Sequence, residues 1–551
     1  MKRSLAMILA CLLLTGCGPQ KQQEPSIPET ETAPLAAPIT EQGKAQYVSP
    51  LGAPTIITLS DDGILVDRLD SGADEDAVMV THDIIYYEDR ETYDSGNPYG
   101  EGEPEERHSA QEAAAHMVVN ITKPGAYLVQ GKLSAGQIRV DLGKDAYEEE
   151  TAVVDLILNN ADITCTVAPA ILFLNTYECD GNWSEEDAKP DVDTSAAGAN
   201  LILEGQNSVN GSHVAKIFKD KDGEKKLWKQ DGAIYSYMSM NVSGSGSLEL
   251  TADNEGLDTE LHLTVNGGNI TIYSGNDGIN TNEDGVSVTT INDGNLTIFA
   301  GLDKEGDGID SNGYLVINGG TVISAAHPAS DAGLDSDLGS FVHGGTVIAM
   351  GSAMDWAESD SKQVTMNLQF AGQQKAGSKV TVTKEDGTEV FSFENNGQHA
   401  RQFSGLILSH PAFTQGETYQ IYVDGQQMAY TGTDVVRGPG GFGGRPGNMP
   451  ENFDPQNMPE GFEPGRMPGN FNPENPPEDF DPSQMGGRGP RPEGMMPPED
   501  FDGQRPEGME PPEGLDPSRI PGGQQNQTGE TQTGFYMNDK VNAFSGVTAA
   551  Q

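Results

Sequence analysis

Basic residues are scarce in this chain of 551 residues. It carries 32 Lys and Arg against 84 Asp and Glu, which gives a formal net charge of -52. A polyanion would be repelled, so no nucleic-acid partner is expected, and docking on anionic lipid through a basic face is also disfavoured. No Arg lies between Arg139 and Arg401, and Lys304 is the only Lys between Lys229 and Lys362.

Cysteine is also rare, with four residues in the chain. Two of them lie in the apolar N-terminal stretch, which leaves Cys165 and Cys179 for the rest. These thiols could form a disulfide in an exported protein, or they could lie unpaired and buried on neighbouring strands. Helical periodicity is missing as well: no amphipathic helical pattern of useful length lies between Leu248 and Met350.

A repeat runs from Asp253 to Gly351. One part is a Gly-led strand that starts at residues 266, 292, 318 and 343, in steps of 26, 26 and 25. The other is an acidic turn around Gly256, Gly278, Gly308 and Gly333. The strand residues are β-branched or aliphatic and are interrupted by Gly, Asn and Asp. A period of this length predicts an all-β solenoid, a parallel β-helix with three short strands per turn.

The N-terminus, residues 1–17, reads MKRSLAMILACLLLTGC and has the charge, apolar core and length of a signal peptide. Its end resembles the lipobox of bacterial lipoproteins, which implies cleavage before Cys17 and a lipid on that thiol; the alternative is an ordinary secretory signal. Acyl chains would anchor the protein to the outer face of the cell membrane. Residues 18–50 are rich in Pro, Glu, Gln and Thr and predict a disordered tether.

The rest of the chain divides by composition. Residues 51–361 are assigned to the β-helix, with an acidic insert from Tyr86 to His116, and residues 362–435 to a small β-subdomain with a hairpin turn at residues 384–387. Residues 436–530 are rich in Pro, Gly and Met and predict disorder. Residues 531–551 are more apolar and could return to pair with a strand of the folded part.

The acidic turns predict calcium. Neighbouring levels of a parallel sheet lie about 4.8 Å apart. At an effective dielectric near 20, two bare carboxylates at that distance repel by about 3 kcal/mol. Lysine pairing is unavailable here, whereas Ca²⁺ accepts carboxylate, amide and carbonyl oxygens with a tolerance that Mg²⁺ lacks. The simpler alternative is that each acid hydrogen-bonds its own turn backbone. The candidate ligands are Asp253, Glu255, Asp258, Asp277, Asn280, Asp307, Asp310, Asp331, Asp335 and Asp337, with Asp355, Glu358 and Asp360 as a possible last site.

These features together resemble the clostridial surface carbohydrate-binding β-helix family. The resemblance rests on the lipobox, on GQIRVDLGKDA and DLILNNADITC, on the DGI[DN][ST] turns that alternate with NGGTV strands, and on the Pro/Gly/Met segment. It covers most of residues 55–432. It implies a right-handed, pectate-lyase-like β-helix that binds calcium at successive levels and binds plant cell-wall polysaccharide without established lyase activity. Asn280 and Ala332 depart from the acidic pattern, so fewer or weaker metal sites could follow.

The function expected from this resemblance is non-catalytic binding of an acidic polysaccharide, with calcium bridging protein and uronate carboxylates. Stacking on sugar rings is a candidate role for Trp228, Tyr235, Tyr237 and Trp356, beside Trp183; the alternative for each is packing in the core or a loop. A rival is a calcium-dependent polysaccharide lyase with Lys304 as its base. The NTD and GHG signatures of polygalacturonases are missing. A structural spacer or adhesin is a third reading.

Overall fold

The computed structural model describes residues 47–67, 76–88, 104–182, 184–217, 228–352, 355–397, 399–434 and 526–551. The predicted signal peptide, residues 18–46 of the predicted tether, and residues 435–525 lie outside the described residues. The described chain belongs to one compact unit that starts at Gln46. Tyr47 and Ser49, which were assigned to the tether, already contact the folded part, because both hydroxyls donate to Asp155 Oδ2, at 3.0 and 2.6 Å.

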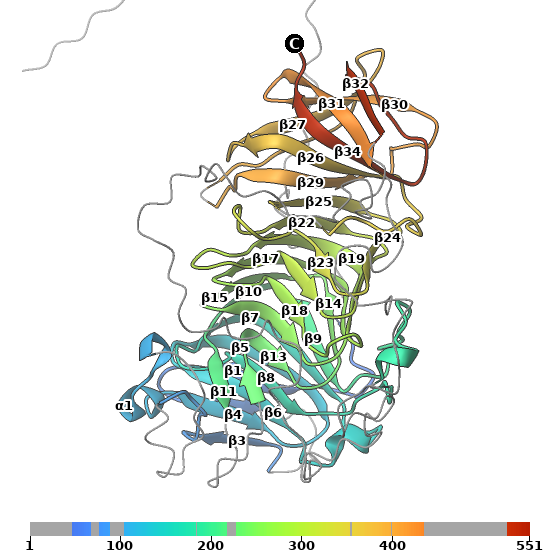
Figure 1. The fold of residues 1–551 in the computed structure, drawn as a ribbon. Coiled ribbons are helices and arrows are strands. Elements are labelled where there is room, and N and C mark those ends of the chain that lie inside the picture. The colour runs from blue at the N-terminus through green and yellow to red at the C-terminus, as the bar shows by residue number, and fades with distance from the viewer. Residues whose placement is uncertain are drawn as a thin grey trace, which may run out of the picture. The chain divides into compact units, whose positions relative to one another are not determined.

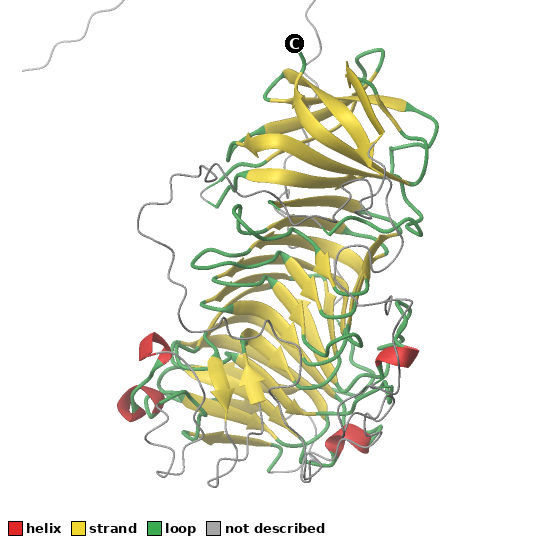
Figure 2. Ribbon diagram, in the orientation of Figure 1, coloured by secondary structure: helices red, strands yellow, loops and turns green. Residues whose placement is uncertain are grey.

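The fold is all-β, with only short helices such as α1 (Ala110–Ala113) in loops (Figure 2). One sheet is a single ladder whose neighbouring strands are parallel, except for the antiparallel pair at its start. Its strands, in order, are β3 (Val78–Thr81), β4 (Met117–Ile121), β6 (Gly136–Asp141), β8 (Ile171–Asn175), β13 (Gly232–Ser236), β16 (Glu255–Thr259), β18 (Ile279–Thr281), β20 (Ile309–Ser311) and β23 (Asp335–Ser336). Within the described ranges, no helix has the length and apolar character needed to cross a membrane.

Two more parallel ladders make up most of the larger sheet (Figure 1). One consists of β1 (Thr55–Leu59), β5 (Gly125–Leu133), β7 (Val154–Thr164), β9 (Ala199–Glu204), β14 (Met240–Gly244), β17 (Leu263–Ser274), β19 (Val288–Phe299), β21 (Tyr314–Ile317) and β24 (Gly339–Val342). The other joins β7, β10 (Gln206–Gly211), β15 (Ser247–Ala252), β17, β19, β22 (Thr321–Ala325) and β25 (Thr346–Gly351). The long strands β7, β17 and β19 belong to both ladders. The shorter β2 (Leu65–Asp67) pairs with β1, and β11 (Val214–Ile217) with β12 (Trp228–Gln230).

The predicted strand repeat is confirmed by the register. Ile270 pairs with Leu296, Leu296 with Val322, and Val322 with Val347. These residues are at most 1% exposed, so each aliphatic side chain is buried between its own counterparts one level above and below. Such ladders form the main hydrophobic core, which runs from Ile57 to Val347 and beyond.

Glycine is required at two kinds of position in the repeat, for two different structural reasons. The strand-leading Gly268, Gly294, Gly320 and Gly345 have positive φ, between 74° and 104°, as the turn chemistry requires. The turn glycines have no positive φ. A Cβ on Gly278 would lie 2.6 Å from the carbonyl oxygen of Gly308 and would collide with Ile298. Close approach between levels, rather than backbone conformation, therefore fixes glycine in the acidic turns.

Residues 362–434 and 526–551 build a second core beyond β25. The strands are β26 (Thr365–Gln374), β27 (Lys379–Lys384), β28 (Glu389–Glu394), β29 (Phe403–Ser409), β30 (Thr418–Val423), β31 (Gln426–Asp434), β32 (Asn526–Gln532), β33 (Phe535–Tyr536) and β34 (Val541–Ala549). Strand β29 pairs antiparallel with both β25 and β26, which attaches this part to the last level of the parallel stack. The predicted hairpin at residues 384–387 is present between β27 and β28.

The C-terminal segment returns, as the sequence suggested. Strand β34 lies between β26 and β31, and its Phe544 and Val547 are buried in the second core. Strand β32 begins five residues before the predicted boundary at 531 and pairs with β31, Asn526 opposite Thr433. Cys165 and Cys179 are not bonded to each other, and burial raises the pKa of each thiol to about 12.

We expect Gly278→Ala to destabilise the fold strongly, because the new methyl has no room beside Ile298 and the Gly308 carbonyl. Overpacking of this kind costs about 1–3 kcal/mol or more. Thermal unfolding measures it. The matched control is Gly372→Ala, where a Cβ meets nothing within 4 Å; equal melting temperatures for the two variants would contradict the close-approach argument.

Candidate metal and glycan site

Two columns of polar side chains lie side by side on the ladder of short strands. In the first column, Asp258, Asn280, Asp310 and Asp335 are direct register partners on β16, β18, β20 and β23. Each is therefore about one strand spacing, roughly 4.8 Å, from the next. The sequence repeat thus stacks residues of one kind from successive levels into a single line.

The second column lies three residues earlier in each repeat. It contains Glu255, Asp277, Asp307 and Ala332, because the amides of Gly256, Gly278 and Gly308 donate to the carbonyls of the last three. Two of these acids also accept a bond from the next level: Asp307 N–H donates to Asp277 Oδ1 at 2.7 Å, and Ala332 N–H donates to Asp307 Oδ1 at 2.5 Å. We call the two columns together the acidic row.

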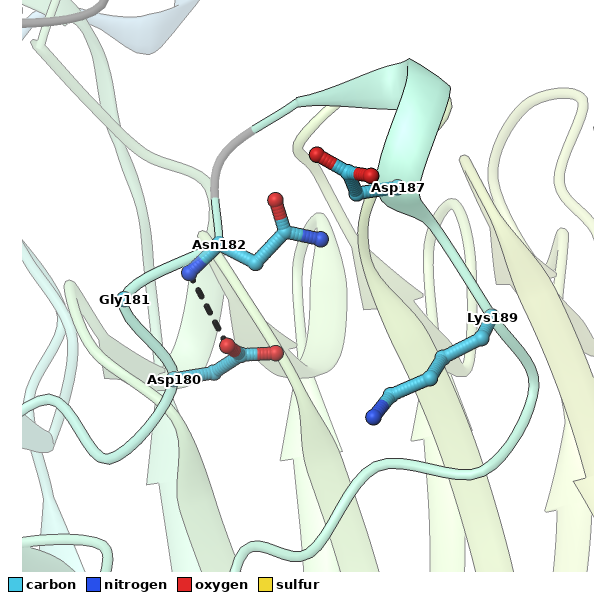
Figure 3. A pocket seen from close by; sticks show the side chains of 5 residues that line it. All are labelled: Asp180, Gly181, Asn182, Asp187 and Lys189. Atoms are coloured by element: carbon cyan, nitrogen blue, oxygen red, sulfur yellow. Dashed lines mark hydrogen bonds between the residues drawn. The ribbon is translucent and has the colours of Figure 1, made fainter.

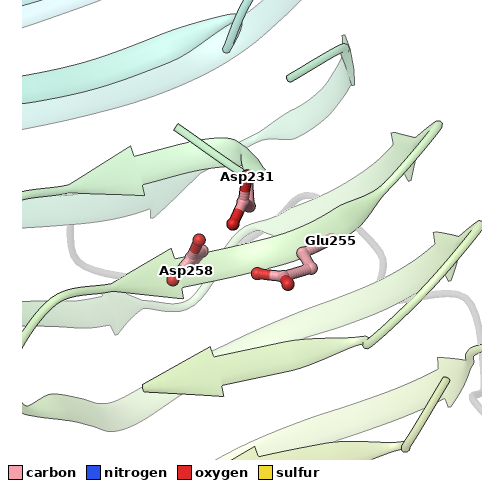
Figure 4. Close-up of side chains that lie close together, drawn as sticks. All are labelled: Asp231, Glu255 and Asp258. Atoms are coloured by element: carbon pink, nitrogen blue, oxygen red, sulfur yellow. The ribbon is translucent and has the colours of Figure 1, made fainter. Parts of the chain in front are cut away.

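Three carboxylates converge at one end of the acidic row. One oxygen each of Asp231, Glu255 and Asp258 lies within 4.8 Å of the others, and Figure 4 shows the three side chains pointing toward one another. Glu255 and Asp258 are buried. Asp231 was missed by the sequence analysis, although its Asp-Gly pair before β13 repeats the turn pattern of the following levels.

Burial and mutual repulsion raise the pKa values of these carboxyl groups. Burial, then the charges of neighbouring acids, raises the pKa of Asp277 and of Asp310 well above the ordinary range. The pKa of Asp307 rises to about 7 through burial and then Asp335. The same happens, again led by burial, at Asp355 and Glu358, whose pKa values rise to about 7. No Lys or Arg among the described residues forms an ion pair with Asp277, Asp307 or Asp310.

The residues of the acidic row fit a hard divalent cation. Asn280 is 6% exposed, and within the described structure its Oδ1 has no hydrogen-bond partner. Its Nδ2 donates to Asn282 Oδ1 at 3.2 Å, which leaves the carbonyl oxygen, between the levels of Asp258 and Asp310, for another partner. A buried amide oxygen among carboxylates is the donor set of Ca²⁺.

Two other predicted ligands, Asp253 and Asp331, accept hydrogen bonds from neighbouring groups. Asp253 is exposed and accepts from Ser212 Oγ at 2.5 Å, and it lies 3.0 Å from His213 Nδ1. Asp331 Oδ2 accepts from Gly306 N–H at 2.8 Å. Asp337 lies beyond β23, and partial desolvation, followed by the charges of Asp284 and Asp335, raises its pKa. At the far end, Ser336 Oγ donates to Asp355 Oδ2 at 2.8 Å, which joins Asp355 to the last level.

The described aromatic candidates differ in exposure. Tyr235 is fully buried and its hydroxyl donates to Glu260, so the stacking prediction is wrong for this ring, because no face is open to a ligand. Tyr237 is partly buried and packs edge-on against Tyr235, with ring centroids 5.1 Å apart. Trp356 is partly exposed. The side chain of Trp228, and all of Trp183, lie outside the described residues.

The chain belongs to the family of carbohydrate-binding domain-containing proteins, whose profile matches residues 115–402. A protein of that description from Acetivibrio thermocellus is 31% identical over 155 residues, which span 28% of this chain and 44% of the relative. The chain therefore matches less than half the length of that relative. Among solved structures, a polysaccharide lyase-like protein from C. thermocellum, studied as a gadolinium derivative, is 21% identical with a TM-score of 0.30, covering 53% of this chain and 93% of that one.

The raised carboxyl pKa values predict an inverted pH dependence for the calcium-free protein. Between about pH 4 and about pH 7 the folded chain binds more protons than the unfolded chain, because the folded pKa values of Asp307, Asp355 and Glu358 are the higher ones. Stability in EDTA should therefore fall as the pH rises through this window. Melting curves from pH 5 to pH 8 test this, and a melting temperature that rises toward pH 7 would count against it.

His213 makes a second pH-dependent contribution to folding stability, and this one comes from attraction to neighbouring acids rather than from repulsion. Burial alone would lower its pKa, but Asp253 and Glu106, at 3.0 and 3.2 Å, raise it to about 9. The stabilisation is complete below the unfolded pKa of about 6.5 and is lost as the pH rises through about 9. His213→Gln should cost about 3 kcal/mol at pH 6 by denaturant unfolding, and much less at pH 9.5. His108→Gln, at a surface contact with Glu112, is the control; a cost that is constant with pH would refute the charge argument.

Proposed function

We propose that this chain is a non-catalytic polysaccharide-binding protein whose acidic row holds Ca²⁺, and that the bound ions contact the carboxylates of an acidic glycan. The observation that carries the proposal is the first column, in which Asp258, Asn280, Asp310 and Asp335 are register partners on consecutive strands. Membership of a carbohydrate-binding family supports the class of ligand.

Calcium resolves two physical problems at once. Repulsion between stacked carboxylates, about 3 kcal/mol per neighbouring pair at an effective dielectric near 20, is relieved by a divalent cation. The same cation reverses the sign of the local field, so a protein with a net charge of -52 can bind an anionic polymer. The ligands would be Asp231, Glu255 and Asp258 at one end of the row, and Asp277, Asn280, Asp307 and Asp310 along it.

The proposal extends to architecture and location. The three parallel ladders, with steps of 26, 26 and 25 residues, support a right-handed β-helix. The lipobox-like sequence that ends at Cys17 supports a lipid anchor and display on the outer face of a bacterial membrane. At a cell surface, the successive levels of the stack would give a polysaccharide several equivalent binding positions along the protein.

The exposed position of Lys304, the candidate base of a lyase, favours binding without catalysis. A general base must be positioned within hydrogen-bond reach of the proton it removes. The side chain of Lys304 is exposed on the loop between β19 and β20, and no described group holds it in place. A lyase mechanism through Lys304 therefore lacks the required positioning.

The decisive experiment is a pull-down of the full chain on insoluble polygalacturonate. Binding should occur in millimolar calcium and disappear in EDTA, and it should weaken in Asp310→Asn but not in Asp293→Asn, an exposed acid outside the row. Calcium should raise the melting temperature of the wild type more than that of Asp310→Asn, because a ligand at 100 times its Kd contributes about 2.7 kcal/mol per site.

Two results would overturn parts of this proposal. Binding that is indifferent to EDTA would remove calcium from the mechanism, and absence of binding would favour a structural spacer. Growth of absorbance from an unsaturated product on soluble polygalacturonate, lost in Lys304→Ala, would show a lyase instead.

A further inference from the structure

A polar cavity of about 460 Å³ lies in the loop that follows β8 (Figure 3). It is lined by Asp180, Gly181, Asn182, Asp187 and Lys189. It is a shallow depression open to solvent, so a ligand would contact it on one side. Among the described residues that line it, the side chains are polar or charged, which suits a ligand that presents hydroxyl and charged groups.

A buried histidine, His262, lies beside Asp180. His262 is 1% exposed, and its Nδ1 accepts a bond from Val288 N–H at 3.0 Å. The proton of the neutral imidazole is therefore on Nε2, which faces Asp180 Oδ2 at 3.4 Å. The other oxygen, Oδ1, accepts from Asn182 N–H at 2.9 Å, the dashed line in Figure 3.

These neighbours favour the ionised form of the Asp180 carboxylate. The nearby His262 imidazole is the main cause that lowers the pKa of Asp180 below its ordinary value. Each carboxylate oxygen retains a further lone pair after these contacts, so it can accept from a ligand hydroxyl. The amide of Asn182, drawn beside the cavity in Figure 3, can both donate and accept.

Lys189 supplies a positive charge on the other side of the cavity (Figure 3). Its side chain is exposed and forms no ion pair with any described residue. Its charge also contributes to the lowered pKa of Asp180, after His262 and Asn182. A ligand carboxylate would complete the arrangement with a charge-assisted hydrogen bond.

The cavity loop packs against the ladder that carries the acidic row. Glu185, within the short helix η4 (Glu185–Asp187), lies so close to the turn after β18 that a Cβ on Gly285 would be 2.8 Å from its Cγ. Strand β18 holds Asn280. The cavity is therefore next to the levels at which calcium is proposed.

We propose that this cavity binds one uronic acid residue of the polysaccharide, with Lys189 pairing with its carboxylate and with Asp180 and Asn182 bonding to its hydroxyls. This inference rests on the proposed function, and it adds a calcium-independent contact that distinguishes a uronate from a neutral sugar.

The test measures binding of polygalacturonate oligomers to the calcium-loaded full chain by titration calorimetry. Lys189→Met should weaken the affinity about tenfold, whereas Lys189→Arg should stay within about threefold of the wild type. Lys384→Met, an exposed lysine at the end of β27, is the matched control for the loss of one positive charge. Asp180→Asn should weaken binding as well, and every variant should keep the calcium-induced rise in melting temperature.

The possible outcomes separate the two proposals. Wild-type binding that Lys189→Met leaves unchanged, or that Lys384→Met weakens equally, overturns the uronate cavity and leaves calcium-dependent binding intact. A wild-type chain that does not bind the oligomers overturns the proposed function itself, and the cavity assignment with it.

Discussion

The spacing between levels of the parallel stack is the constraint on which the rest of this structure depends. At about 4.8 Å, a side chain has its own counterpart from the next repeat as its nearest neighbour. For Leu257, Ile279 and Ile309 this favours stability, since apolar atoms are buried against apolar atoms. For Asp310 and Asp335, one residue further along the strands, the same spacing sets charge against charge.

A single geometry therefore produces both the core and the site. The aliphatic ladders fix the strands in register, and the register leaves the carboxylates no freedom to move apart. The cost of that arrangement is visible in the raised pKa values of Asp277 and Asp310 and in the orphaned carbonyl of Asn280. If a cation occupies the row, its binding free energy adds to the folding stability, as in other sites that are assembled only by folding.

Sequence reasoning predicted most of what depends on periodicity. The strand repeat, the alignment of Asp258 with Asn280 and Asp310, and the return of β34 all follow from local pattern. The pattern could not show that Asp253 is drawn away by His213, because that contact joins residues 40 positions apart and brings in Glu106 from a third element. Nor could it show that Tyr235 is buried, since an aromatic residue that occupies the Asp258 column looks the same in sequence whether it faces solvent or Glu260. Asp180, His262 and Lys189 lie outside the repeat and meet only through the loop, so no period marked them.

The pairing of β31 with β32 has a consequence for how the chain withstands proteases. Thr433 lies opposite Asn526, so the residues that flank the segment 435–525 are adjacent. The peptide after residue 525 is clamped between β26 and β31 through β34, with Phe544 locked in the second core. A cut anywhere in residues 435–525 would then yield two polypeptides that migrate separately on a denaturing gel yet stay associated in native buffer.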